Sequence, residues 1–214
     1  MRKIFILSLL TLPLFLLSRG FLNSGDNEAI KAPFKLRSDI HDYLKINDEA
    51  LDPLEGFWSL NVKRTLYDND AEIALETEPN RMGLAIIKED DFYRVYDGNE
   101  NSNFIGLFSK TTSPELFNYQ CYFINTKDFV SAIAYFKNKK IIEYEYDVPD
   151  GLMKHYYAYG FENEKKEILE KIENGTLRLN WKFTWLKYDS YEQPKKEWAN
   201  HGKHFHEMDK NLIF

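Results

Sequence analysis

The densest group of side chains that could bind a metal lies near the C-terminal end of the chain. It consists of His201, His204, His206 and Glu207. A helix would place His201 and His204 on one face, and an extended chain would do the same for His204 and His206. Either conformation offers two imidazoles, whereas zinc needs a third or fourth ligand. Lys210 also stands where helical zinc proteases carry their second histidine. We therefore favour a solvated polar tail over residues 191–214, with a metal site at the three histidines as the alternative.

Carboxylates supply the next candidates for chemistry. Residues 68–72 begin like a calcium-binding loop, but Ile73 occupies the position where that loop requires glycine. Glu143 and Glu145 could serve a hydrolase, yet they alternate with tyrosines, which is typical of the solvent side of a strand. The sequence has no Gly-x-Ser-x-Gly elbow, phosphate loop or dinucleotide fingerprint. It predicts a protein without catalytic residues or a cofactor.

Cys121 is the only cysteine, so no disulfide can form within the chain. It alternates with Tyr119 and Phe123, a pattern that predicts a buried hydrophobic residue rather than a nucleophile.

The first 20 residues have the layout of a secretory signal peptide. Arg2 and Lys3 precede a mostly apolar run at residues 4–17, and polarity returns at residues 18–20. The run is shorter than the ~20 residues that a membrane-spanning helix needs, and Pro13 interrupts it. We expect a secreted or periplasmic protein, with an uncleaved N-terminal anchor as the alternative.

Charge limits the class of partner. Without the basic residues at positions 2, 3 and 19, the chain keeps 25 basic against 34 acidic residues, a net charge near −9. Such a chain has no electrostatic reason to bind nucleic acid or an anionic membrane surface. We expect no nucleic-acid partner and no stable membrane insertion after signal cleavage, while the sequence leaves any protein partner open.

A period of two dominates the chain after Gly56 and predicts strands with one buried face. It is clearest over residues 176–185, where one face collects Leu177, Leu179, Trp181, Phe183 and Trp185. A change of phase after Trp185 suggests a bulge. Further strands are expected around Tyr144 and Tyr146 and at residues 57–64, 83–88, 92–97, 104–109, 117–124, 129–136 and 153–159.

Two helices and one long loop complete the predicted elements. Ser38 can begin a short helix with an apolar face at Ile40, Tyr43 and Leu44, and a second turn follows at residues 47–51. A late helix is expected from Asn163 to Glu173. Residues 65–81 are largely polar and indicate a loop at the mouth of the fold. The organisation is then an extension at residues 21–53, a β domain at 54–190 and the polar tail.

About nine short strands with hairpin connections predict a mainly β protein, an antiparallel meander closed into a barrel or folded as a β-sandwich. Phe214 at the C-terminus is a feature also found in outer-membrane barrels. Most predicted strands are shorter than the ~9–11 residues needed to cross a membrane, so we favour an inward apolar face. Residues 129–136 are apolar on both faces apart from Ser131, which suits a strand covered by a helix or loop.

Gly56-x-Trp58 follows a short helical turn and opens the first strand. It resembles the Gly-x-Trp signature of lipocalins and related calycin barrels. The resemblance implies a lipocalin-like barrel in which Trp58 closes the floor beneath a basic side chain, for which Arg178 and Lys182 are the candidates. The second motif of the family, Thr-Asp-Tyr, is absent.

The chain contains 14 Tyr, 16 Phe and 4 Trp, and aromatic side chains both fill cores and line pockets for apolar ligands. Trp58 and the group Tyr156, Tyr157 and Tyr159 are the predicted ligand-binding residues. The preferred hypothesis is an exported, non-catalytic barrel that binds a small apolar or amphipathic molecule. The alternative is a surface or protein-interaction module with a solid core.

Overall fold

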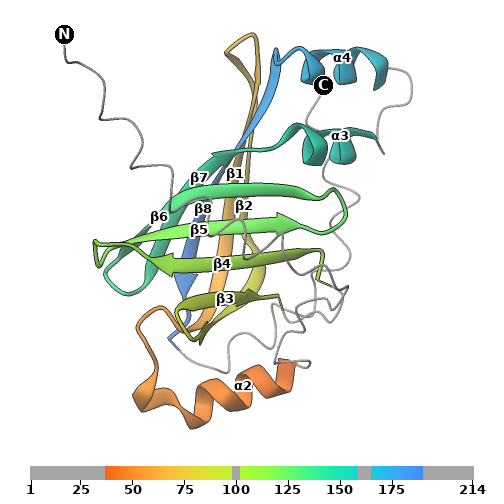
Figure 1. The fold of residues 1–214 in the computed structure, drawn as a ribbon. Coiled ribbons are helices and arrows are strands. Elements are labelled where there is room, and N and C mark those ends of the chain that lie inside the picture. The colour runs from red at the N-terminus through yellow and green to blue at the C-terminus, as the bar shows by residue number, and fades with distance from the viewer. Residues whose placement is uncertain (1–36, 98–101, 159–164, 190–214) are drawn as a thin grey trace, which may run out of the picture. The chain divides into compact units, whose positions relative to one another are not determined.

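In the computed structural model, eight antiparallel strands form a closed barrel in which each strand pairs with the next along the chain (Figure 1). The structure describes residues 37–97, 102–158 and 165–189. The strands are β1 (Gly56–Asp68), β2 (Ala71–Glu89), β3 (Phe92–Tyr96), β4 (Phe104–Lys110), β5 (Leu116–Phe123), β6 (Asp128–Lys137), β7 (Ile141–Asp147) and β8 (Leu177–Lys187). The predicted mainly β meander is confirmed, as a barrel rather than a sandwich.

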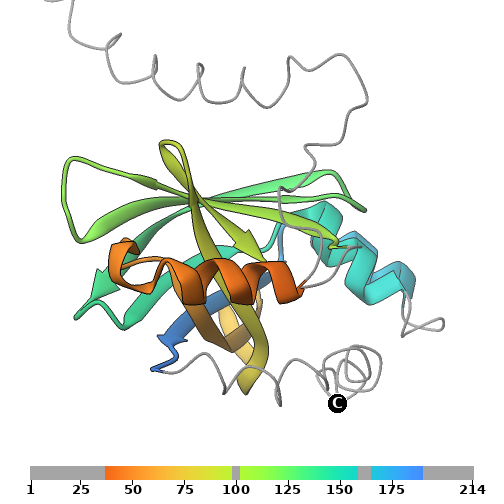
Figure 2. The same cartoon turned by 90° about the horizontal axis from the view of Figure 1, so that it is seen from below.

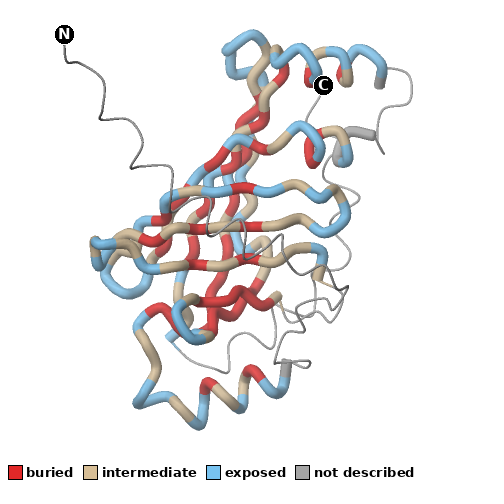
Figure 3. Tube along the Cα trace, in the orientation of Figure 1, coloured by how far each residue is buried: buried red, intermediate tan, exposed pale blue. Residues whose placement is uncertain are grey.

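β8 pairs with β1 and closes the barrel, from Trp58 opposite Lys187 to Asp68 opposite Leu177. Its apolar face points into the interior, because Leu177, Leu179, Trp181, Phe183 and Trp185 are all buried. Figure 3 shows the same alternation of buried and exposed residues along the barrel strands. The inward apolar face expected from the period of two is therefore confirmed.

The bulge expected after Trp185 is wrong. β8 keeps an unbroken register with β1 through Lys187. Leu186 simply points outward and is 41% exposed, so an apolar residue on the outer wall produced the apparent change of phase. The real register shifts lie between β1 and β2, at Leu60/Val62 and Leu66/Tyr67.

The loop expected at residues 65–81 is also wrong, because this segment is the hairpin of β1 and β2. It turns at Asn69 and Asp70, which both have positive φ (49° and 64°), as short hairpin turns require. The strand pattern was hidden because Glu76 and Glu78 occupy inward positions of β2, where apolar residues are the rule.

The strand expected at residues 153–159 is wrong as well. Residues 150–158 form helix α3 (Asp150–Ala158), which follows Pro149 and buries Leu152 and Met153. The tyrosines of this segment favoured a strand by propensity, but packing decided otherwise. The predicted late helix is confirmed as α4 (Lys165–Glu173), which buries Ile168 and Ile172.

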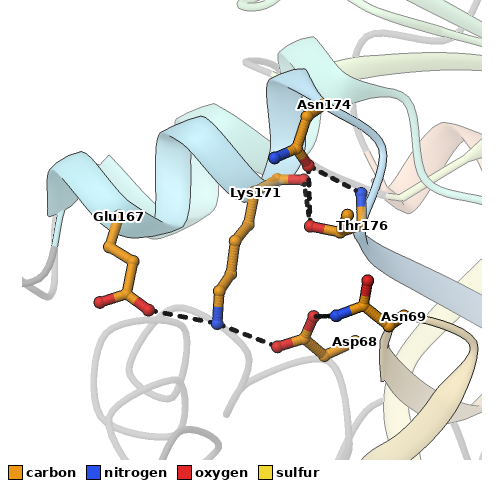
Figure 4. A network of polar contacts seen from close by, with 6 residues as sticks. All are labelled: Asp68, Asn69, Glu167, Lys171, Asn174 and Thr176. Carbon is orange, nitrogen blue, oxygen red and sulfur yellow. Dashed lines mark hydrogen bonds and ion pairs between the residues drawn. The ribbon is translucent and has the colours of Figure 1, made fainter.

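α3 and α4 connect β7 to β8 and lie at one end of the barrel (Figure 1). Lys171 of α4 holds this end to the β1–β2 hairpin, since its Nζ lies 2.9 Å from Asp68 Oδ2 and 3.2 Å from Glu167 Oε1 (Figure 4). Asn174 then ends the helix, and its side chain accepts the backbone N–H of Thr176 at 3.0 Å.

Helix α2 (Arg37–Ile46) crosses the opposite end of the barrel (Figure 2), followed by the 3-10 helix η1 (Asp48–Ala50). The predicted apolar face is confirmed for Ile40 and Leu44, which are buried, and Tyr43 is half-buried. In the described residues, no helix has the length and apolar character required to span a membrane.

Cys121 lies on the inward face of β5 and is only 2% exposed, as predicted. Burial raises the pKa of its thiol to about 12, so the reactive thiolate is scarce at neutral pH. We expect an aromatic disulfide reagent at pH 8 to leave the folded protein unlabelled and to label one thiol after denaturation. Rapid labelling of the folded protein would contradict an inward position for Cys121.

Candidate functional site

The candidate site is the barrel interior, which Trp58 closes at the end near α2; we call this end the floor. Trp58 is fully buried, and its Nε1–H donates to the carbonyl oxygen of Leu54 at 3.1 Å. Gly56 has φ of 136°, and a Cβ there would lie 2.9 Å from Cε of Lys187. The backbone conformation therefore favours glycine at this position, and a larger residue would also displace the end of the Lys187 side chain.

Lys187 is the basic side chain against Trp58. Its Nζ lies 5.7 Å from the centre of the Trp58 ring and donates to the carbonyl oxygen of Pro53 at 2.7 Å. Burial lowers the pKa of Lys187, although Glu55 and Asp52 oppose that effect. Lys187 shares the inward parity of Trp185, so the alternation of β8 was the signal that could have identified it.

The two basic residues expected at this position lie elsewhere. Both have the outward parity of β8. Arg178 bonds to Asp147 at 3.0 Å and lies 4.5 Å from the Tyr67 ring, near the opposite end of the strand. Lys182 is exposed on the outer wall. Their assignment beside Trp58 is therefore wrong.

Glu55 anchors the floor and was missed by the sequence analysis. It is 4% exposed, and its carboxylate accepts the backbone N–H groups of Asp52 (2.9 Å) and Lys88 (3.0 Å) and the hydroxyl of Tyr43 (3.3 Å). A buried carboxylate is stable only with such partners. Glu55 therefore ties α2 and β2 to the segment that carries Trp58.

Above the floor the interior is a stack of aromatic rings around Tyr144. Its ring centre lies 4.3 Å from that of Tyr119 and 4.9 Å from that of Phe183. The indole N–H of Trp185 donates to the Tyr144 hydroxyl at 3.2 Å. Burial is the main cause that raises the pKa of Tyr144 and of Tyr119, so both phenols stay neutral at physiological pH.

The inward side chains are buried from the floor to the α3–α4 end. Trp58 and Trp185 at the floor are 0% and 1% exposed. Phe183, Trp181 and Tyr146, which follow toward α3 and α4, are 6%, 7% and 9% exposed. Leu66 and Leu179, nearer still to that end, are 1% and 4% exposed. The interior is thus closed along its length, and its wall between Tyr144 and the α3–α4 end is largely aromatic.

A network of charged groups lies beside Trp181. Arg64 is 5% exposed, its guanidinium lies 6.0 Å from the Trp181 ring centre, and Nη1 contacts Glu76 Oε2 at 2.9 Å. Glu78 pairs with both Arg64 and Arg81. No sequence signal marks this network, because the polar residues 65–81 resemble a loop.

The structure does not bring the predicted ligand-binding residues together. Trp58 lies at the floor, and the backbones of Tyr156 and Tyr157 belong to α3 at the other end (Figure 1). Tyr159 lies outside the described residues, as do His201, His204 and His206 and residues 1–20. Within the described part of the chain, no group of three or more metal-type side chains occurs.

Comparison with protein-family models, with curated proteins and with solved structures found no significant match. Evidence on the function of this protein therefore comes from the geometry of the barrel interior.

A pair of lysines on β8 tests the floor. Lys187→Met removes a charged hydrogen bond and a cation–π contact, so we expect a loss of about 1–3 kcal/mol in the free energy of unfolding. Lys182→Met, on the outer wall, is expected to change it by less than about 0.5 kcal/mol. Urea denaturation measures both, and equal effects would contradict a special role for Lys187.

A second pair tests the buried network. Arg64→Met leaves the carboxylates of Glu76 and Glu78 without their shared partner, so we expect the free energy of unfolding to fall by about 3 kcal/mol. Lys63→Met, at the exposed neighbouring position, is the control. It is expected to change the free energy of unfolding by less than about 0.5 kcal/mol. Thermal and urea unfolding report the difference, and an Arg64→Met variant as stable as the parent would show that the network does not stabilise the barrel.

Proposed function

We propose that this protein is an exported, non-catalytic barrel that binds a small apolar or amphipathic molecule in the half of its interior between Tyr144 and the α3–α4 end. The observation that carries the proposal is the buried charge of Arg64, which lies over the Trp181 ring in this half of the interior. A core built only for stability would hold apolar residues there, because well-packed apolar side chains in place of buried ion pairs are often neutral or stabilising.

The chemistry of the walls indicates what the ligand offers. Tyr146, Trp181 and Phe183 present flat apolar surfaces, and binding sites are commonly lined by such side chains with a few polar groups. Arg64 and Glu76 supply the polar groups on the same side of the interior. A ligand with an apolar body and a small polar end fits this combination. The signal-like residues 1–20 and the Gly56-x-Trp58 resemblance to lipocalins support export and binding, respectively.

An inward substitution tests the binding site. Ala132 belongs to β6, is half-buried and packs against the interior core. Ala132→Phe adds a ring to the space that the ligand needs, so we expect the Kd for a dansyl-labelled fatty acid to rise at least about tenfold. Dansyl fluorescence excited through tryptophan measures the titration.

The matched control is Thr77→Phe, which adds a ring on the outward face of β2, where Thr77 is exposed. It should leave the Kd unchanged. Native mass spectrometry of the protein purified from its own compartment should also show a retained small molecule that Ala132→Phe loses. Undiminished binding by a folded Ala132→Phe variant would place the probe outside the barrel and defeat the proposal.

A further inference from the structure

An apolar stripe runs along the outer wall of β6. Phe129, Ile133 and Tyr135 point outward, with Ser131 between the first two, and are 49%, 58% and 38% exposed, and Ile124 in the preceding turn is 45% exposed. We call these four residues the outer β6 patch. The cover that the sequence predicted for this strand is absent from the described residues. Contiguous exposed apolar surface of this kind usually marks an interaction site.

The outer face, rather than the strand edge, is the part open to a partner. β6 pairs with β7 only from Tyr135 to Lys137. Beyond that point the two strands diverge (Figure 1), but α3 closes the far end of the gap, since a Cβ on Gly151 would lie 2.6 Å from Asp128 Oδ2. An added strand would need about 4.8 Å of room on each side along its length. A partner therefore meets the side chains of the patch.

Opposite charges stand at the two ends of the patch. Lys127 is exposed before Phe129, and Glu115 is exposed at the other end, where its carboxylate accepts the Tyr135 hydroxyl at 2.9 Å. Lys137 Nζ lies 5.2 Å from the centre of the Tyr135 ring but is paired with Glu143, which leaves Glu115 as the net charge at that end. A two-fold axis through the middle of the patch would bring Phe129 of one copy against Tyr135 of the second. It would also bring Lys127 of each copy toward Glu115 of the other. The patch is thus complementary to itself both in the order of its apolar residues and in the charges at its two ends.

We propose that the outer β6 patch is the interface of a homodimer formed by two antiparallel β6 strands packed face to face. Four side chains that are 38–58% exposed make a small patch, well below the ~800 Å² per partner of stable complexes. The dimer is therefore weak and depends on concentration.

Sedimentation velocity of the full chain at about 5–500 µM tests the proposal across the range of weak interfaces. The average mass should rise toward that of a dimer, and Ile133→Lys should remove the rise. Ile73→Lys supplies the control, because Ile73 is 55% exposed but lies on β2. It should dimerise like the parent. Circular dichroism verifies that both variants are folded.

A charge exchange tests the two-fold arrangement. Lys127→Glu and Glu115→Lys should each raise the dimer Kd about fivefold or more, because each sets like charges against each other twice. The double variant restores both pairs and should return to within about twofold of the parent. A chain that stays monomeric throughout would overturn the proposal. A double variant whose dimer Kd stays as high as that of the single variants would also overturn it. So would an Ile73→Lys variant that fails to dimerise, because that would indicate a head-to-tail contact.

Discussion

The ladder between β1 and β8 is the contact on which the rest of the structure depends. It joins segments more than a hundred residues apart, from Trp58 opposite Lys187 to Asp68 opposite Leu177. Without it both strands would be open edges, and the inward faces of the sheet would have no common interior. Trp58 and Lys187 lie opposite each other in this ladder, so the contact that seals the floor also fastens the closure.

Much of the fold follows from side-chain periodicity, and the errors have a common cause. β5 and β8 could be predicted because most of their inward residues are apolar and most of their outward residues are polar. The pattern fails where inward residues are charged, as at Glu76 and Glu78, and where an outward residue is apolar, as at Leu186. A pattern of residue types records the usual environment of a side chain, whereas tertiary partners decide the actual one.

The residues of the candidate site also fall into two groups, those that a local sequence pattern marks and those that only tertiary contacts bring into place. Trp58 was found through a local motif, and the aromatic wall of β8 through its parity. Glu55 gives no comparable signal, because its three partners come from α2, its own turn and β2. Arg64 and Glu76 meet only through the β1–β2 register, which is offset by a shift at Leu60/Val62 that no sequence rule locates. Pairing across strands is a non-local property, and the sequence leaves it open.

The charged network of Arg64, Glu76 and Glu78 is the part of the interior that burial destabilises most. Removing Arg64 and its glutamates from water costs several kcal/mol per ion, and well-packed apolar residues in place of buried ion pairs are often neutral or stabilising. Arg64 nevertheless lies over the Trp181 ring, in the half of the interior away from the floor. Under the proposed function, charges at that position beside flat apolar walls orient the polar end of a ligand held between Tyr146 and Arg64.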